Sequence, residues 1–192
     1  MKKKYLLILL LCSSFSFSQK KFGAFTGLNY ILLTKGNYEG LMSEHSISFH
    51  IGILYQMDIN EKISFRPKLM FSQQGDRKKT AENSIFNLTN LDYKLNYINV
   101  PLDFKFGNKF YLLTGPQIGY LINTKKMSAD YGNIKSEIDL GLNLGCGINI
   151  NQYFIELGTY KGFSKLFEYE DEYDEKHFLT NTLFRLSLGY NF

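Results

Sequence analysis

The stretch ISFHIGILYQM, residues 47–57, places a large apolar or aromatic side chain at every second position, with mostly small or polar residues between them. This alternation indicates a β-strand with one apolar face, because successive side chains of a strand point to opposite sides of the sheet. A soluble β-sandwich would turn that face toward a protein core, whereas a membrane-spanning barrel would turn it toward lipid. The rest of the chain decides between these two structures.

Further stretches repeat the alternation. Together with the first they predict strands at residues 21–31, 46–59, 63–74, 97–106, 110–122, 137–150, 153–164 and 178–192. Short turns at 60–62, 107–109 and 151–152 alternate along the chain with long polar loops at 32–45, 75–92, 123–136 and 165–177. This layout predicts an all-β fold, an eight-stranded antiparallel up-and-down transmembrane β-barrel of the outer-membrane kind.

The two faces of the predicted strands differ in charge and in glycine content. On the apolar face, Lys161 is the only charged residue, and no glycine lies there. The other face carries most of the 16 glycines and both signs of charge, at Lys21, Asp58, Arg66, Lys68, Asp103, Lys105, Glu137, Asp139, Glu156 and Arg185. Because the inside of an eight-stranded barrel barely accommodates side chains, small residues must alternate with long ones there. The polar face is therefore predicted to line the lumen and the apolar face to meet lipid.

Aromatic residues gather near both ends of the apolar face. Phe22, Tyr55, Phe65, Phe106, Phe110, Tyr153 and Phe192 lie near the short turns, and Tyr30, Phe71, Tyr120, Phe163 and Phe178 lie near the long loops. Two such belts are expected where aromatic rings meet the headgroups on each side of a membrane.

The N-terminus, MKKKYLLILLLCSSFSFSQ, has the basic, apolar and small-residue regions of a secretory signal peptide. We expect the signal peptide to occupy residues 1–18, which leaves residues 19–192 as an outer-membrane β-barrel domain. Without the lysines at 2–4, the formal net charge falls from +4 to +1, so the composition gives no indication of a nucleic-acid partner. Cys146 is then the only cysteine, which leaves it no partner for an intramolecular disulfide.

Three stretches resemble a known family. SFRPKLMFSQQG (64–75), YINVPLDFKFG (97–107) and FYLLTGPQIGYLI (110–122) are similar to strand signatures of the PorT-like outer-membrane β-barrel proteins of the Bacteroidetes, and the closing LSLGYNF fits the same group. The resemblance implies an outer-membrane barrel of undefined function, in a family whose founding member is tied to type IX secretion. It also implies that Leu188, Tyr190 and Phe192 form the C-terminal signal that the barrel assembly machinery reads.

The charges of the predicted lumen balance, which favours a filled interior over an aqueous pore. We expect a structural network of ion pairs among Arg66, Lys68, Asp103, Lys105, Glu156 and Arg185. His50 is expected to point inward as a hydrogen-bonded interior group.

Two irregularities are also predicted. Pro67, Pro101 and Pro116 each remove a backbone donor from a predicted strand, and bulges would accommodate them. In the fourth strand the apolar positions shift by one residue, which predicts a further bulge near residues 96–98.

These features favour a structural or interaction role at the cell envelope, with surface loops for adhesion or with the barrel as an accessory of a secretion or envelope complex. Two alternatives stay open: a rim-located enzyme of acyl transfer or hydrolysis, and a narrow small-solute transporter. His45 and His177 lie in different outer loops near serines and acids, without the spacing of a triad, so we expect no enzyme.

We expect no catalytic, cofactor-binding or metal site. The acidic stretch EYEDEYDEKH (168–177) lacks the glycine and the spacing of a dedicated calcium loop. The expected partners are outer-membrane lipid and lipopolysaccharide, the barrel assembly machinery and an envelope protein, with no nucleic acid. The expected location is the bacterial outer membrane, with both termini in the periplasm.

Overall fold

The computed structural model describes residues 22–35, 46–74, 93–126, 136–170 and 176–192, which form ten β-strands. These are β1 (Phe22–Lys35), β2 (Ser46–Tyr55), β3 (Met57–Asp58), β4 (Ile63–Gln74), β5 (Tyr93–Phe106), β6 (Phe110–Lys126), β7 (Ile138–Ile150), β8 (Tyr153–Gly162), β9 (Phe167–Glu170) and β10 (Lys176–Asn191). In the part of the chain described, no helix is long and apolar enough to cross a membrane.

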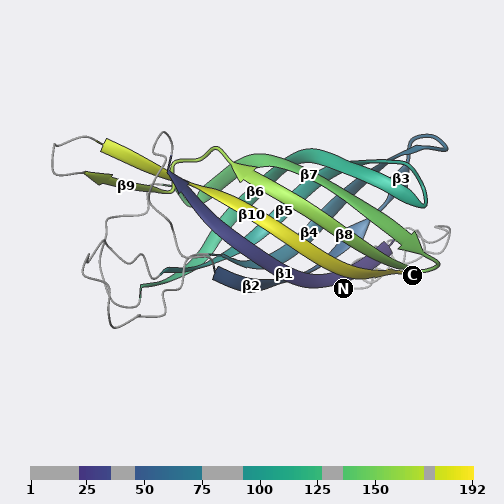
Figure 1. Cartoon of the computed structure of the whole chain (residues 1–192), viewed down its shortest axis with the longest axis horizontal. Helices are drawn as coiled ribbons and strands as arrows, with labels where there is room; N and C mark the ends of the chain where they lie inside the picture. Colours follow the sequence, from purple (N-terminus) through teal and green to yellow (C-terminus); the bar gives the residue numbers. More distant parts are fainter. Residues whose placement is uncertain (1–21, 36–45, 75–92, 127–135, 171–175) are drawn as a thin grey trace, which may run out of the picture.

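The strands form one closed wall (Figure 1). Each pairs antiparallel with the next in the order β1, β2, β4, β5, β6, β7, β8 and β10, and β10 pairs with β1 to close the sheet. The short β3 continues the path of β2 along β4, and β9 pairs with the beginning of β10. The predicted eight-stranded, antiparallel, up-and-down barrel is confirmed.

Short turns and the chain's closing contact lie at one end of the barrel. In the turn before β4, the side-chain oxygen of Asn60 accepts hydrogen bonds from the backbone of Lys62 and Ile63, at 2.9 and 2.8 Å. The backbone N–H of Phe192 donates to the carbonyl of Phe22 at 2.8 Å, so the last residue lies beside the start of the wall. The C-terminus is at this end in Figure 1, while β9 and the beginning of β10 extend beyond the wall at the other end.

Several strands are longer than predicted. β1 runs to Lys35 and β6 to Lys126, within predicted loops, and β5 begins at Tyr93. β9 also lies in a predicted loop, and the second predicted strand is broken at Gln56. The added segments continue the antiparallel pairing of their neighbours at the loop end. The residues added to β6, at 123–126, are all polar, and those added to β1, at 32–35, read LLTK, so neither shows the alternation that identifies a strand in sequence.

A bulge lies where it was predicted, but on the neighbouring strand. The register between β5 and β6 shifts between Asn96 and Tyr97, and Ile122 of β6 is the extra residue. The predicted change of face within β5 is wrong, since Leu95 and Tyr97 are 1% and 0% exposed and the alternation continues unbroken to Phe106. Apolar side chains therefore enter the lumen at this level, and hydrophobicity alone does not identify the outer face.

The prolines interrupt the ladders without changing their register. The pairing of β4 with β5 skips residues 68–69, beside Pro67, and resumes at the same offset. The pairing of β5 with β6 skips residues 102–103, after Pro101, again with no shift, and Pro116 lies in an unbroken register with β7. The predicted bulges at the prolines are therefore wrong, and the missing donors leave local gaps in the hydrogen bonding instead.

The wall has an apolar outside and a polar inside. On the outside, large apolar side chains such as Ile47 and Phe110 are each 71% exposed. Soluble monomers rarely expose contiguous apolar patches larger than a few hundred Å². Buried polar side chains on the inside include Asn29, His50, Arg66, Lys68, Ser72, Asn99, Asp103, Lys105, Gln117, Asp139, Glu156 and Asn181. The predicted orientation of the two faces is confirmed.

Large lumen side chains lie over glycines of the adjacent strand. Phe154 is paired in register with Gly189, and Tyr111 with Gly147. A Cβ atom added to Gly189 would overlap the ring of Phe154, and one added to Gly147 would lie 2.5 Å from Cζ of Tyr111. These positions need glycine because the rings occupy the space of a side chain.

Candidate functional site in the barrel lumen

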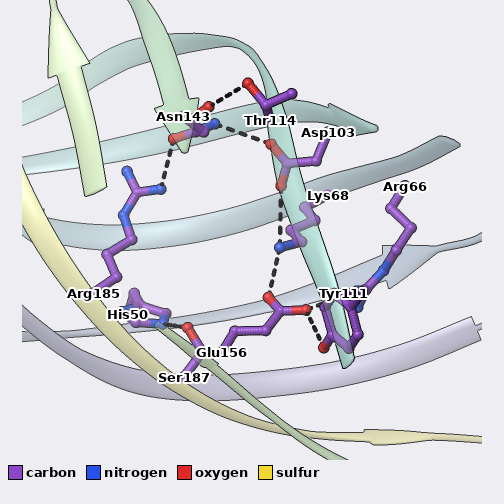
Figure 2. A network of polar contacts seen from close by, with 10 residues as sticks. All are labelled: His50, Arg66, Lys68, Asp103, Tyr111, Thr114, Asn143, Glu156, Arg185 and Ser187. Carbon is purple, nitrogen blue, oxygen red and sulfur yellow. Dashed lines mark hydrogen bonds and ion pairs between the residues drawn. The ribbon is translucent and has the colours of Figure 1, made fainter. Parts of the chain in front are cut away.

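Glu156, on β8, is the centre of the network that crosses the lumen (Figure 2). Its carboxylate is buried and accepts three hydrogen bonds, from Arg66 Nη1 at 2.7 Å, from Lys68 Nζ at 2.8 Å and from the hydroxyl of Tyr111 at 2.9 Å. Both cations come from β4, which lies four strands away from β8 around the closed wall. The ion pairs therefore connect opposite sides of the barrel.

The network continues from Lys68 toward β10. Lys68 Nζ lies 3.1 Å from Oδ2 of Asp103, and the other carboxylate oxygen of Asp103 accepts from Asn143 Nδ2 at 3.3 Å. Arg185 Nη1 in turn donates to Oδ1 of Asn143 at 3.2 Å. Charged and amide groups thus link strands β4, β5, β7, β8 and β10 across the lumen.

Aromatic rings complete the packing around these cations. The guanidinium of Arg66 lies 5.1 Å from the centre of the Phe154 ring, and the ammonium of Lys105 lies 4.5 Å from the centre of the Tyr111 ring. Both distances are within the range of cation–π attraction. Lys105 also donates a long hydrogen bond of 3.5 Å to Gln56, and among the described residues it forms no ion pair.

The structure joins four of the six predicted network residues by ion pairs: Arg66, Lys68, Asp103 and Glu156. Arg185 joins them only through Asn143, and Lys105 remains apart from the ion pairs. Arg66 and Asp103 are direct cross-strand neighbours, yet each pairs with another residue. The structural role of all six residues stays a prediction.

Tyr111 and Asn143 belong to the network but were not predicted. Both occupy inward positions of strands whose faces the sequence identifies, and Tyr111 is paired with a glycine. Large lumen residues lie opposite glycines in this barrel. With the register of β6 and β7 known, the pairing of Tyr111 with Gly147 would have indicated that Tyr111 fills the lumen.

The other predicted lumen charges lie in different surroundings. Asp139 is buried, and its Oδ2 accepts from Asn181 Nδ2 at 2.9 Å. Glu137 is exposed and accepts from the hydroxyl of Tyr120 at 3.2 Å, so its predicted place in the lumen is wrong. The reason is that Glu137 precedes the first residue of β7 and lies at the rim. Asp58 is exposed near the short turns, and Lys21 lies outside the described residues.

His50 is held in a second polar cluster. Its Nδ1 lies 2.8 Å from Oδ1 of Asn29, and its Nε2 lies 2.9 Å from the hydroxyl of Ser187. The amide nitrogen of Asn29 donates to Ser72 and to backbone carbonyls, which leaves its oxygen as the acceptor for Nδ1–H. The prediction that His50 is a hydrogen-bonded interior group is confirmed.

The charged and polar groups of the lumen contact one another. Across the described ranges, no group of three or more His, Cys, Asp and Glu residues is placed to hold a metal ion. The predictions for His45, for the side chain of His177 and for the acidic stretch 168–177 fall on residues or side chains that the structure does not describe. The charged side chains fill the lumen and connect its walls through ion pairs and hydrogen bonds.

The predicted C-terminal signal lies on the outer face beside the short turns. Leu188 and Phe192 are exposed, and the ring of Tyr190 lies 5.1 Å from that of Tyr153 and 5.5 Å from that of Phe192. These contacts place Tyr190 and Phe192 in the aromatic belt of this end, and Leu188 is exposed on the same strand. Their recognition by the assembly machinery stays a prediction.

A closed barrel with an ion-paired lumen and an apolar exterior defines the class of transmembrane β-barrel proteins. The family described as outer membrane protein beta-barrel domain matches residues 16–168, and the chain belongs to this family. The protein is therefore a β-barrel of the bacterial outer membrane.

Solved outer-membrane barrels have a similar fold. Neisserial surface protein A is 11% identical, with 89% of this chain and 97% of that chain covered and a TM-score of 0.59. OprG of Pseudomonas aeruginosa is 10% identical, with coverages of 90% and 96% and a TM-score of 0.50. Ail, the attachment invasion locus protein of Yersinia pestis, is 15% identical, with coverages of 91% and 100% and a TM-score of 0.47. Among curated proteins, none matches the chain.

Leu144 tests the contact of the outer face with lipid. It is 61% exposed and lies at the middle of β7. We expect Leu144→Arg to lower the free energy of unfolding in lipid vesicles by about 2–4 kcal/mol, because an arginine there lies near the bilayer midplane. Ile138→Arg, at the beginning of the same strand and on the same face, is expected to cost about 0–1 kcal/mol. Equal costs for the two arginines in urea titrations would contradict this placement in the membrane.

Proposed function

We propose that the protein is a closed scaffold of the outer membrane whose outer loops carry the function, in adhesion or as an accessory of a secretion or envelope complex. The observation that supports this proposal is the position of Glu156, bound from the opposite wall by Arg66 and Lys68. To open a path for a solute, these groups would have to separate inside the lumen. Buried charges left without a partner cost several kcal/mol, so the network disfavours transport.

The proposal includes an orientation. In outer-membrane barrels the short turns face the periplasm and the longer loops face the outside. The residues between β1 and β2, β4 and β5, and β6 and β7 would then be extracellular, and both termini periplasmic. We further propose that the barrel is PorT-like and is not an enzyme. Its partners would be outer-membrane lipid and lipopolysaccharide, the barrel assembly machinery and an envelope protein.

Co-purification tests the role of the loops. Residues 36–45, 75–92 and 127–135 would each be replaced by a short turn, in separate variants of the full chain. We expect at least one replacement to abolish co-purification of an envelope protein from detergent-solubilised outer membranes, while the variant still shows the electrophoretic mobility of a folded barrel. Lys109→Ala, in a short turn of the opposite end, is the matched control and should retain the partner.

Two results would contradict the proposal. If no loop replacement changes the set of co-purified proteins, the loops do not carry an interaction. A large, steady conductance in planar lipid bilayers would show an open lumen and favour the transporter instead. The enzyme alternative would gain support if an outer-loop replacement abolished hydrolysis of a lipid or ester substrate by the purified barrel.

A further inference from the structure

A small cavity lies inside the lumen beside Arg185. Its volume is about 40 Å³, and its polar lining includes Lys68, Asp103, Asn143, Glu156, Arg185 and Ser187. A water molecule occupies about 30 Å³ in the liquid, so this volume has room for one small ligand. A monatomic ion or a water molecule fits this size.

Two glycines create the space. Gly145 on β7 and Gly158 on β8 are paired in register and both line the cavity. A Cβ atom added to Gly158 would meet no atom closer than 3.4 Å, unlike the glycines beneath the lumen rings. Among the described residues other than its two chain neighbours, no side-chain atom lies within 4 Å of the Cβ position of Gly158, which distinguishes it from the glycines that lie beneath rings.

Arg185 presents unused donors at the cavity. Its Nη1 donates to Asn143, but its Nε and Nη2 are buried without a hydrogen-bond partner. Among the residues that the structure describes, Arg185 makes no ion pair. In Figure 2 its guanidinium is turned toward Asn143 and away from Glu156. These two nitrogens carry three N–H bonds, and leaving them buried without a partner is costly unless a negatively charged acceptor completes them.

The acids of the cavity are already neutralised. Glu156 is paired with Arg66 and Lys68, and Lys68 is also paired with Asp103, so two acids balance two bases in this cluster. Asp139 is bound by Asn181 elsewhere in the lumen. Arg185 therefore adds one positive charge that no ion pair offsets in the described wall.

We propose that the cavity binds one monovalent anion of halide size, held by Nε and Nη2 of Arg185 in the space left by Gly145 and Gly158. The site is independent of the proposed role of the loops, because it lies within the wall. Bound halide would compensate the charge of Arg185, and it would stabilise the folded barrel by an amount that grows with the logarithm of the halide concentration once that concentration exceeds the dissociation constant.

Two measurements test the site. Crystals of the barrel grown in sodium bromide are expected to show a bromide anomalous peak beside Arg185. In detergent, the unfolding midpoint is expected to rise with bromide or chloride concentration, compared with sodium gluconate at equal ionic strength. A water molecule alone in the cavity, with equal midpoints in halide and gluconate, would overturn the proposal.

Variants separate the site from general salt effects. Arg185→Met is expected to abolish the halide-dependent shift, and Gly158→Ala should abolish it too, because its methyl group enters the cavity while the fold has room for it. Gly158→Ala keeps the test decisive if Arg185→Met fails to fold. Lys105→Met removes a buried cation that does not line the cavity, and it should retain the shift. A shift that persists in Gly158→Ala would overturn the assignment.

Discussion

Glu156→Gln is expected to lower the free energy of unfolding of the barrel by about 3–5 kcal/mol, because it removes one partner from a buried ion-pair network. Of the ion pairs among the described residues, Arg66 would lose the one it makes, and Lys68 would keep the one with Asp103. The substitution keeps the size of the side chain, so the loss reports charge rather than a cavity. Few single substitutions cost as much.

Equilibrium urea unfolding in detergent micelles or lipid vesicles measures this effect. The chain has no tryptophan, so far-ultraviolet circular dichroism and the mobility difference between folded and unfolded barrel are suitable signals. Glu137→Gln is the matched control, because Glu137 is exposed at the rim and should change stability by no more than about 0.5 kcal/mol. If both variants unfold at the same urea concentration, the network does not hold the barrel together.

A compensating variant distinguishes charge imbalance from loss of packing. Arg66→Met combined with Glu156→Met removes one acid and one base, and it leaves Lys68 paired with Asp103 at 3.1 Å. Replacement of a buried ion pair by apolar side chains of similar volume is often neutral. The double variant is therefore expected to be more stable than Glu156→Gln, and a lower stability would show that the geometry of the salt bridges matters more than their charge balance.

The alternation at residues 47–57 and its repeats predicted the barrel and the orientation of its wall, because lipid and lumen impose opposite requirements on the two faces. The same rule failed at Leu95 and Tyr97, which are apolar and lie inside. At that level of the lumen, rings and aliphatic groups fill space that charged residues fill elsewhere. The polarity of alternate residues therefore identifies the lipid-facing side of a strand only at levels of the barrel where the lumen is polar.

The partners within the lumen could not be predicted from strand order. Arg66 pairs with Glu156 across the barrel rather than with Asp103, its direct neighbour on the next strand. Such a contact depends on the tilt and stagger of all the strands between, which no local pattern encodes. Glycine gave more local information, since the rings of Phe154 and Tyr111 lie over the glycines that are paired with them.

Phe154→Ala is expected to cost about 3–5 kcal/mol, the usual range for removal of a buried phenylalanine. The ring is 1% exposed and packs with Phe25, Leu54 and Met70 near the short turns. It also lies beside the guanidinium of Arg66, so its removal loosens the cation that binds Glu156. The measurement is the urea midpoint, under the conditions used for Glu156→Gln.

Gly189 provides a second test of the packing around Phe154. The ring of Phe154 occupies the space that a side chain at residue 189 would need. Gly189→Ala alone is expected to cost about 1–3 kcal/mol by overpacking. In the Phe154→Ala background the added methyl group would enter the vacated space, so the double variant should lose less than the two single losses combined, by about 1–3 kcal/mol. Gly158→Ala, a lumen glycine with room for a methyl group, should be near neutral in halide-free buffer. Additive losses at 154 and 189 would mean that the ring and the glycine do not share one space, and the packing rule for this lumen would fail.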